Sequence, residues 1–203
     1  MGVLRGFIWA LYAACSCTAL ACGNGRLDAF ESQPSGLIDD FEDLNNHAAY
    51  DVGWWFIVND GTGTQSYEIV PPGDRPGDKG ALHSSGSGFT GWGAEVGVSL
   101  SGTGAGGSYD ASRFSALEFS AKSAGGANSA MTVWFVDQAH SYSYPATLTS
   151  GWAPYHVPFA AAVYSGDSTL RLDSAQLICI QFSFSGSSTF DLWLDDVAFV
   201  SNP

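Results

Sequence analysis

Residues 190–199, FDLWLDDVAF, are the stretch that decides how the rest of this chain is interpreted. Their aromatic and branched side chains predict a β-strand. Adjacent carboxylates interrupt the run, and a sheet buries such groups only when a partner compensates their charge. Residues 37–43, LIDDFED, form a similar run near the other end of the chain. We therefore expect the first and last strands of the fold to lie side by side, with their carboxylates sharing one cation.

The composition is that of an exported all-β domain. The 203 residues are 45% hydrophobic and 14% aromatic but only 13% charged, and they include 25 glycines. Soluble domains usually carry roughly 25% charged residues. The net charge of −13 argues against nucleic acid as a partner, because phosphates would be repelled. It also argues against adsorption to an anionic membrane and favours divalent cations and neutral ligands.

Residues 1–21 have the pattern of a signal peptide. A basic start precedes the apolar run 6–14, which is too short to span a bilayer. Residues 19–21, ALA, fit a small-x-small cleavage site before Cys22. This run resembles the lipobox of bacterial lipoproteins, and Cys15 is a second candidate. We expect a protein secreted or lipid-anchored through Cys22 at the bacterial cell envelope. Ordinary secretion with a spare cysteine stays open as the alternative.

The remaining chain divides into a polar tether, 22–36, and one domain, 37–203. Short apolar or alternating segments separated by turn residues predict about ten to twelve strands and no amphipathic helix. This pattern is typical of a β-sandwich or jelly roll with two antiparallel sheets. The clearest strands are 38–42, 52–58, 65–70, 81–84, 95–100, 114–121, 131–137, 177–184 and 190–199. Residues 140–147 fit a strand or a loop, and the two prolines of 152–159 predict an edge or irregular strand.

The sequence resembles the galactose-binding-like jelly rolls, and most of all the family-11 type of carbohydrate-binding module. The motifs that carry this resemblance are the first and last runs together with WAPYHVPF at 152–159. The run GFTGWGAE at 88–95 is also similar to many exported bacterial proteins of this kind. The resemblance implies a module that binds polysaccharide on a concave sheet.

The resemblance further implies a structural calcium that ties the first strand to the last. By residue match its ligands are Asp40, Glu42 and Asp196, with Asp195 as a further candidate. Calcium requires several oxygen ligands, and neighbouring carboxylates repel one another without a cation. The alternative is that these carboxylates lie at strand ends in solvent and are neutralised by lysines or by turn amides.

Sugar binding requires exposed aromatic rings and side chains that hydrogen-bond hydroxyl groups. The candidate rings are Trp55, Trp92, Trp134, Tyr142 and Tyr144, and for each of them the alternative is a place in the core. We expect Tyr142 and Tyr144 to be exposed, because they alternate with serines. Gln181 alternates with the row of Ile178, Ile180, Phe182 and Phe184, and it is a candidate hydrogen-bonding residue on the same sheet.

We expect a non-catalytic, monomeric module that binds polysaccharide. The glycines at 102, 104 and 107 match a nucleotide-binding pattern, but no helix follows them, so we interpret them as a loop. Glu95 and Glu118 are the strand-borne glutamates that could serve a glycan hydrolase, and both fit outward positions. The alternatives are a jelly-roll hydrolase or lyase, and a structural or adhesive envelope protein that binds other proteins.

Overall fold

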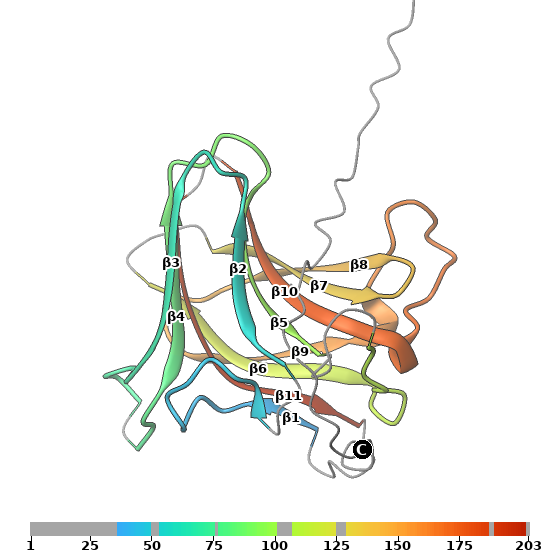
Figure 1. Cartoon of the computed structure of the whole chain (residues 1–203), viewed down its shortest axis with the longest axis horizontal. Coiled ribbons are helices and arrows are strands. Elements are labelled where there is room, and N and C mark those ends of the chain that lie inside the picture. The colour runs from blue at the N-terminus through green and yellow to red at the C-terminus, as the bar shows by residue number, and fades with distance from the viewer. Residues whose placement is uncertain are drawn as a thin grey trace, which may run out of the picture.

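The computed structural model describes residues 36–49, 53–75, 77–100, 107–124, 129–186 and 189–201. Over these ranges the chain is a sandwich of two antiparallel sheets, as the sequence predicts (Figure 1). The expected signal peptide, most of the tether and Cys22 lie outside the described residues. Within the described ranges no helix is long and apolar enough to cross a membrane.

The first sheet has the order β3-β4-β11-β6-β9, with β1 also paired to β11, and the second sheet has the order β2-β5-β10-β7-β8. The short 3₁₀ helices η3 and η4 follow β9 and precede β10. The bounds are β1 Leu37–Asp39, β2 Trp55–Asn59, β3 Thr64–Val70, β4 Ala81–Ser87, β5 Gly93–Ser99, β6 Ala116–Ser123, β7 Ala130–Asp137, β8 Ser141–Thr147, β9 Ala153–Pro158, η3 Phe159–Ala161, η4 Ser174–Gln176, β10 Leu177–Ser185 and β11 Phe190–Val200.

The first and last strands lie side by side. Leu37 is opposite Ala198 and Asp39 is opposite Val197 in an antiparallel pair. In Figure 1 the blue strand β1 runs beside the red strand β11. The register of β11 against β6 shifts between Asp195 and Ala198, and Asp196 has a positive φ of 52° there. The adjacency predicted from the two carboxylate-rich runs is confirmed.

The core lies between the sheets and is rich in aromatic rings. Alternation along β6 and β10 buries the side chains that the sequence predicts, such as Leu117, Phe119 and Phe182, each at most 2% exposed. Phe184 of the second sheet stacks on Phe190 of the first, with ring centroids 4.4 Å apart. Each buried ring removes roughly 150–250 Å² from water, so these rings dominate the packing between the sheets.

The two uncertain segments of the sequence are both strands. Residues 141–147 form β8, an edge strand of the second sheet, and residues 153–158 form β9, an edge strand of the first. Pro154 and Pro158 lie in β9, where an edge position tolerates residues that cannot donate a backbone hydrogen bond on one side.

Candidate functional site

The outer face of the second sheet carries the strongest combination of aromatic and polar side chains. Along β2, Trp55 packs into the core whereas Phe56 is half-buried on the outer side. Trp54, directly before β2, is 52% exposed. On β7 the same alternation turns Trp134 outward between the buried Val133 and Phe135. We call this surface, defined by Trp54, Phe56, Glu95, Trp134 and Gln181, the aromatic face.

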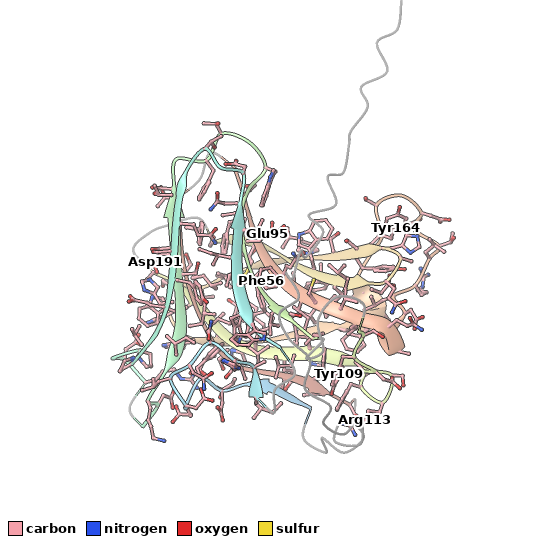
Figure 2. The ribbon with its side chains drawn as sticks, viewed as in Figure 1. Phe56, Glu95, Tyr109, Arg113, Tyr164 and Asp191 are labelled. Atoms are coloured by element: carbon pink, nitrogen blue, oxygen red, sulfur yellow. The ribbon has the colours of Figure 1, made fainter. Side chains whose placement is uncertain are left out.

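The register of the five strands places the members of this face in rows. One row runs across the whole sheet through cross-strand partners, in the order Phe56, Gly97, Gln181, Trp134 and Ser143. The next row contains Val58, Glu95, Ser183, Thr132 and Pro145. Figure 2 shows Phe56 and Glu95 on the neighbouring strands β2 and β5. Aromatic, amide, carboxyl and hydroxyl groups are therefore spread over one continuous sheet surface.

Gly97 lets two of these side chains converge at the centre of the face. A Cβ at this position would lie 2.8 Å from the Phe56 ring and 3.0 Å from Cγ of Gln181. The ring and the amide therefore extend over the glycine from β2 and β10. The result is a ring beside an amide group, the pairing of apolar surface and hydrogen-bonding capacity that a sugar ring requires.

Several polar groups of the aromatic face lack protein partners. The indole Nε1 of Trp134 is buried and has no hydrogen-bond partner among the described residues. The side-chain amide of Gln181 and the carboxyl group of Glu95 also have none within the described part of the chain. Burial raises the pKa of Glu95 to about 7. Buried polar groups are normally hydrogen-bonded, so Nε1 of Trp134 is an exception on this face, whereas the part-buried side chains of Gln181 and Glu95 can bind solvent or a ligand.

The aromatic face is nearly free of charge. In the sequence of the five strands of this sheet, Glu95 and Asp137 are the only acidic residues, and there is no lysine, arginine or histidine. Asp137 lies at the end of β7, is 4% exposed, and accepts hydrogen bonds from the backbone N–H groups of Ala139 and His140. A surface of this kind suits a neutral, hydroxyl-rich ligand.

The outer face of the first sheet has the opposite character, because its charges are paired. His83 contacts Glu68 at 3.6 Å and Asp191 at 3.0 Å, and it stacks on the Trp193 ring with centroids 4.3 Å apart. Lys122 lies over the same Trp193 ring and pairs with Asp74. These side chains satisfy one another, which is typical of a structural surface.

A groove on the first sheet is the main alternative location for a ligand. It has a volume of about 560 Å³ and lies against β3, β4 and β11. Its lining includes the hydroxyl-bearing Thr64, Ser66, Ser85, Ser87 and Thr189 together with Asp191. The one aromatic residue of the lining, Phe190, is only 1% exposed. The groove therefore offers hydrogen bonds but no ring surface on which a sugar could stack.

The interpretation of three predicted rings as exposed platforms is wrong. Trp55 is 2% exposed and its Nε1 donates to Asp39 at 2.7 Å. Tyr142 is also 2% exposed, and its hydroxyl group donates to the carbonyl oxygen of Arg171. Tyr144 is half-buried and packs against the core. The alternation along β8 turns the serines outward and the tyrosines inward, opposite to the expectation.

The other predicted residues lie at the surface. Trp92 is 47% exposed, in the loop directly before β5. Gln181 and Trp134 lie in one row of the aromatic face. Trp54 and Phe56 were missed by the sequence analysis. The run at 54–58, WWFIV, is apolar at every position, so it contains no signal for which side faces the core.

The carboxylates proposed as calcium ligands all contact protein groups. The guanidinium group of Arg75 contacts Asp195 at 2.7 Å and Asp196 at 2.8 Å. Glu42 accepts from the backbone N–H of Lys79, and Asp40 accepts from the backbone N–H of Glu42. Among the described residues no group of three or more acidic, histidine or cysteine side chains is placed to hold a metal ion. This arrangement fits the alternative, in which protein cations and amides neutralise the carboxylates.

Arg75 connects the loop before β4 to β11. Its Nε also contacts Asp78 at 2.7 Å, so one guanidinium group serves three carboxylates. Burial raises the pKa of Asp195 to about 7, and the backbone N–H of Asp196 and the charge of Arg75 act in the opposite direction. The cation that faces the carboxylates of the last strand is therefore a side chain of this loop.

Comparison with solved structures identifies the fold. One similar structure is a family 11 carbohydrate-binding module from Clostridium thermocellum, solved in complex with a β-1,3-1,4-mixed-linked tetrasaccharide. Its sequence is 20% identical to this chain, the TM-score is 0.62, and the match covers 82% of this chain and 95% of the module. The fold is that of the family 11 carbohydrate-binding modules. A family 30 module of a cellulosomal cellulase from the same organism is 17% identical with a TM-score of 0.56, over 74% of this chain and 92% of the module.

The match extends to part of a larger enzyme. An exo-β-agarase is 14% identical with a TM-score of 0.60, and the match covers 83% of this chain but 26% of the agarase. No protein-family profile and no curated protein sequence matches the chain. The predicted jelly-roll fold and its likeness to family 11 modules are thus confirmed at the level of structure.

Proposed function

We propose that this protein is a non-catalytic carbohydrate-binding module that holds a neutral polysaccharide on the aromatic face. The observation that carries the proposal is the row of Phe56, Gln181 and Trp134, which places two aromatic rings and an amide side by side across one sheet face. Rings supply apolar surface for the faces of sugar rings, and the side chains of Gln181 and Glu95 supply hydrogen bonds to hydroxyl groups. The likeness in fold to family 11 and family 30 modules supports the same function.

The placement of the strand-borne glutamates speaks against the hydrolase alternative. Glu95 lies on the outer side of the second sheet, and Glu118 lies exposed on the outer side of the first, where it contacts His156 at 2.9 Å. Glycoside hydrolysis requires two carboxyl groups about 5–9.5 Å apart across one bond. Two glutamates on opposite faces of a sandwich cannot form that pair.

Titration of the protein with mixed-linked β-glucan, xylan and mannan by calorimetry tests the proposal. We expect binding of at least one glycan. Trp134→Ala or Phe56→Ala should weaken it about tenfold or more, equivalent to about 1.4 kcal/mol of lost contact. Trp134→Phe keeps a ring but removes the N–H donor, so its affinity should fall between those of the wild type and Trp134→Ala.

Two variants on the first sheet serve as controls. Trp193→Ala removes a ring from the paired surface, and Ser66→Leu fills the hydroxyl-lined groove. Both should bind glycan like the wild type. Loss of binding in Ser66→Leu with full binding in Trp134→Ala would move the site to the groove and contradict the proposal.

The proposal includes export and anchoring through Cys22. Mass spectrometry of the protein purified from the membrane fraction of a bacterial host should find a lipid on Cys22, and Cys22→Ser should release the protein into the soluble fraction. Unmodified protein in the medium would favour ordinary secretion. We further propose a monomer, which light scattering tests.

A further inference from the structure

We propose that Glu95 determines the specificity of the aromatic face by accepting hydrogen bonds from two adjacent hydroxyl groups of one sugar ring. This inference rests on the proposed function and assigns a role to one residue of its site. The ligand class is a neutral glycan whose sugars keep a pair of neighbouring free hydroxyls.

The position of Glu95 fits this role. It is half-buried on β5 between Val58 of β2 and Ser183 of β10, one row from Phe56 and Gln181. The next outward position on its own strand is Gly97, over which the Phe56 ring and the Gln181 side chain lie, so the carboxyl group is close to both. The backbone is fixed there, since Nε2 of Gln65 donates to the carbonyl oxygen of Glu95 at 2.9 Å. The carboxyl group is therefore held among the groups that we expect to contact the glycan.

The surroundings of Glu95 provide no charged partner. The neighbouring strands present a valine and a serine to it, and the sequence of these strands contains no cation. Asp60, in the turn after β2, accepts hydrogen bonds from Thr62, Gly91 and Gly93, which lower its pKa, so it stays ionised near neutral pH. The His47 ring packs against Trp54 at the opposite end of β2, with the two ring planes tilted. Glu95 is thus an acid kept partly out of water without compensation within the described chain.

An uncompensated, partly buried acid is costly to the fold, and such groups cluster at functional sites. A carboxylate has two oxygens and can accept from two neighbouring hydroxyl groups at once. Hydrogen bonds to a charged acceptor are roughly twice as strong as those between neutral groups. A glycan that supplies both donors would therefore favour the ionised form of Glu95, and by linkage its affinity would depend on the protonation of this residue.

The sign of the pH dependence follows from this assignment. Burial places the pKa of Glu95 at about 7 in the free protein, so the carboxyl group is mostly protonated at pH 6 and mostly ionised at pH 8. If the ionised form binds the glycan, affinity should rise about tenfold between pH 6 and pH 8, in proportion to the ionised fraction.

Calorimetric titrations of the full chain with a mixed-linked β-glucan tetrasaccharide, from pH 5.5 to 8.5, test the inference. The wild type should gain affinity with pH. Glu95→Gln should bind more weakly at pH 8 and show no dependence on pH, because an amide offers one acceptor and does not titrate. Glu68→Gln changes an exposed glutamate on the first sheet and should retain the wild-type profile. Glu95→Gln replaces a partly buried acid, which destabilises the fold, by a neutral group of the same shape, so the variant should fold.

The outcomes separate the inference from the proposed function. Binding that Trp134→Ala abolishes but that shows no pH dependence in the wild type would overturn the role of Glu95 and leave the module standing. A pH dependence that persists in Glu95→Gln would assign it to another group, His47 first, and also overturn the inference. Affinity that falls with rising pH would mean that the protonated acid donates, contrary to the assignment. No binding at any pH would overturn both.

Discussion

At Gly97 the aromatic face depends on the absence of a side chain. Gly97→Ala would place a Cβ 2.8 Å from the Phe56 ring and 2.8 Å from the carbonyl oxygen of Ile180, and the backbone oxygen cannot move as a flexible side chain can. We expect a loss of about 1–3 kcal/mol in the free energy of unfolding, typical of overpacking. Glycan affinity should also fall, because the ring and the Gln181 amide would be pushed apart.

Gly151→Ala is the matched control for this substitution. A Cβ at Gly151 would meet no atom within 4 Å. Chemical denaturation should therefore show an unchanged or slightly increased midpoint for Gly151→Ala and a lower midpoint for Gly97→Ala. Equal midpoints for both variants would show that the sheet adjusts at Gly97 without cost.

Residue-level prediction from the sequence succeeded where one side of a strand is apolar and the other polar. Gln181 alternates with large apolar residues, so its outward position follows from the pattern. The tyrosines of β8 alternate with serines, but both residue types occur on either side of a sheet. In the structure Tyr142 is buried in the core. For Trp54 and Trp55 the side is fixed by pairing, since Trp55 is opposite the buried Val98. That partner is more than forty positions away, and no local pattern shows it.

At the scale of elements, the loop between β3 and β4 is fixed to β11 by Arg75. The side chain of Asp195 is 2% exposed, so loss of Arg75 leaves a buried carboxyl group without its charged partner. We expect Arg75→Met to lower the free energy of unfolding by about 2–3 kcal/mol, at the lower end for buried pairs because Arg75 is partly exposed. Arg171→Met is the control, since Arg171 donates to carbonyl oxygens of its own loop. A second change, Asp195→Asn, should recover part of the loss in urea denaturation.

Arg75→Met also tests the proposed calcium site. An ion that binds Asp195, Asp196, Asp40 and Glu42 in the native state raises the melting temperature by mass action. If calcium ties the first strand to the last, the wild type should melt several degrees lower in chelator, and calcium should restore stability to Arg75→Met. Melting curves that do not respond to calcium or chelator in either protein would contradict the calcium site and leave Arg75 as the cation of these strands.

The sequence predicted the strands better than it predicted the contacts between distant side chains. The two carboxylate-rich runs suggested adjacent first and last strands, and pairing of β1 with β11 confirms this. The same runs led us to expect a shared cation, and the family resemblance implied that this cation is calcium. The cation in the structure is Arg75, which lies 120 positions before Asp195. Only the fold brings such distant residues together, so residue spacing could not predict the ion pair.

At the scale of the whole molecule, the outer faces of the two sheets differ in how their polar side chains are paired. The first sheet pairs its charges in contacts such as His83 with Asp191, which suits a structural role. On the outer face of the second sheet the side chains of Trp134, Gln181 and Glu95 have no hydrogen-bond partner within the described part of the chain, which suits a ligand. Partly buried acids destabilise the free protein, because they lose hydration and protein groups compensate for that loss only in part.

Three partly buried acids make the stability of the protein depend on pH. Burial raises the pKa of Asp39 to about 6, and those of Glu95 and Asp195 to about 7, above the values of unfolded chains. The folded state therefore binds more protons than the unfolded state between about pH 4 and pH 7, so stability should fall as pH rises through this window. The net charge of −13 at neutral pH adds repulsion in the same direction. The melting temperature should be several degrees lower at pH 8 than at pH 5.

Glu95→Gln isolates the contribution of the aromatic face to this pH dependence. At pH 5 the carboxyl group of Glu95 is neutral in the folded protein and partly ionised in the unfolded chain, so the variant and the wild type should differ in stability by less than about 1 kcal/mol. At pH 8 the variant avoids a partly buried charge and should be more stable, by at most about 3 kcal/mol. Calorimetric melts at both pH values measure the difference. A variant that is less stable than the wild type at pH 8 would mean that the ionised Glu95 is stabilised within the free protein, and the need for a ligand to satisfy it would disappear.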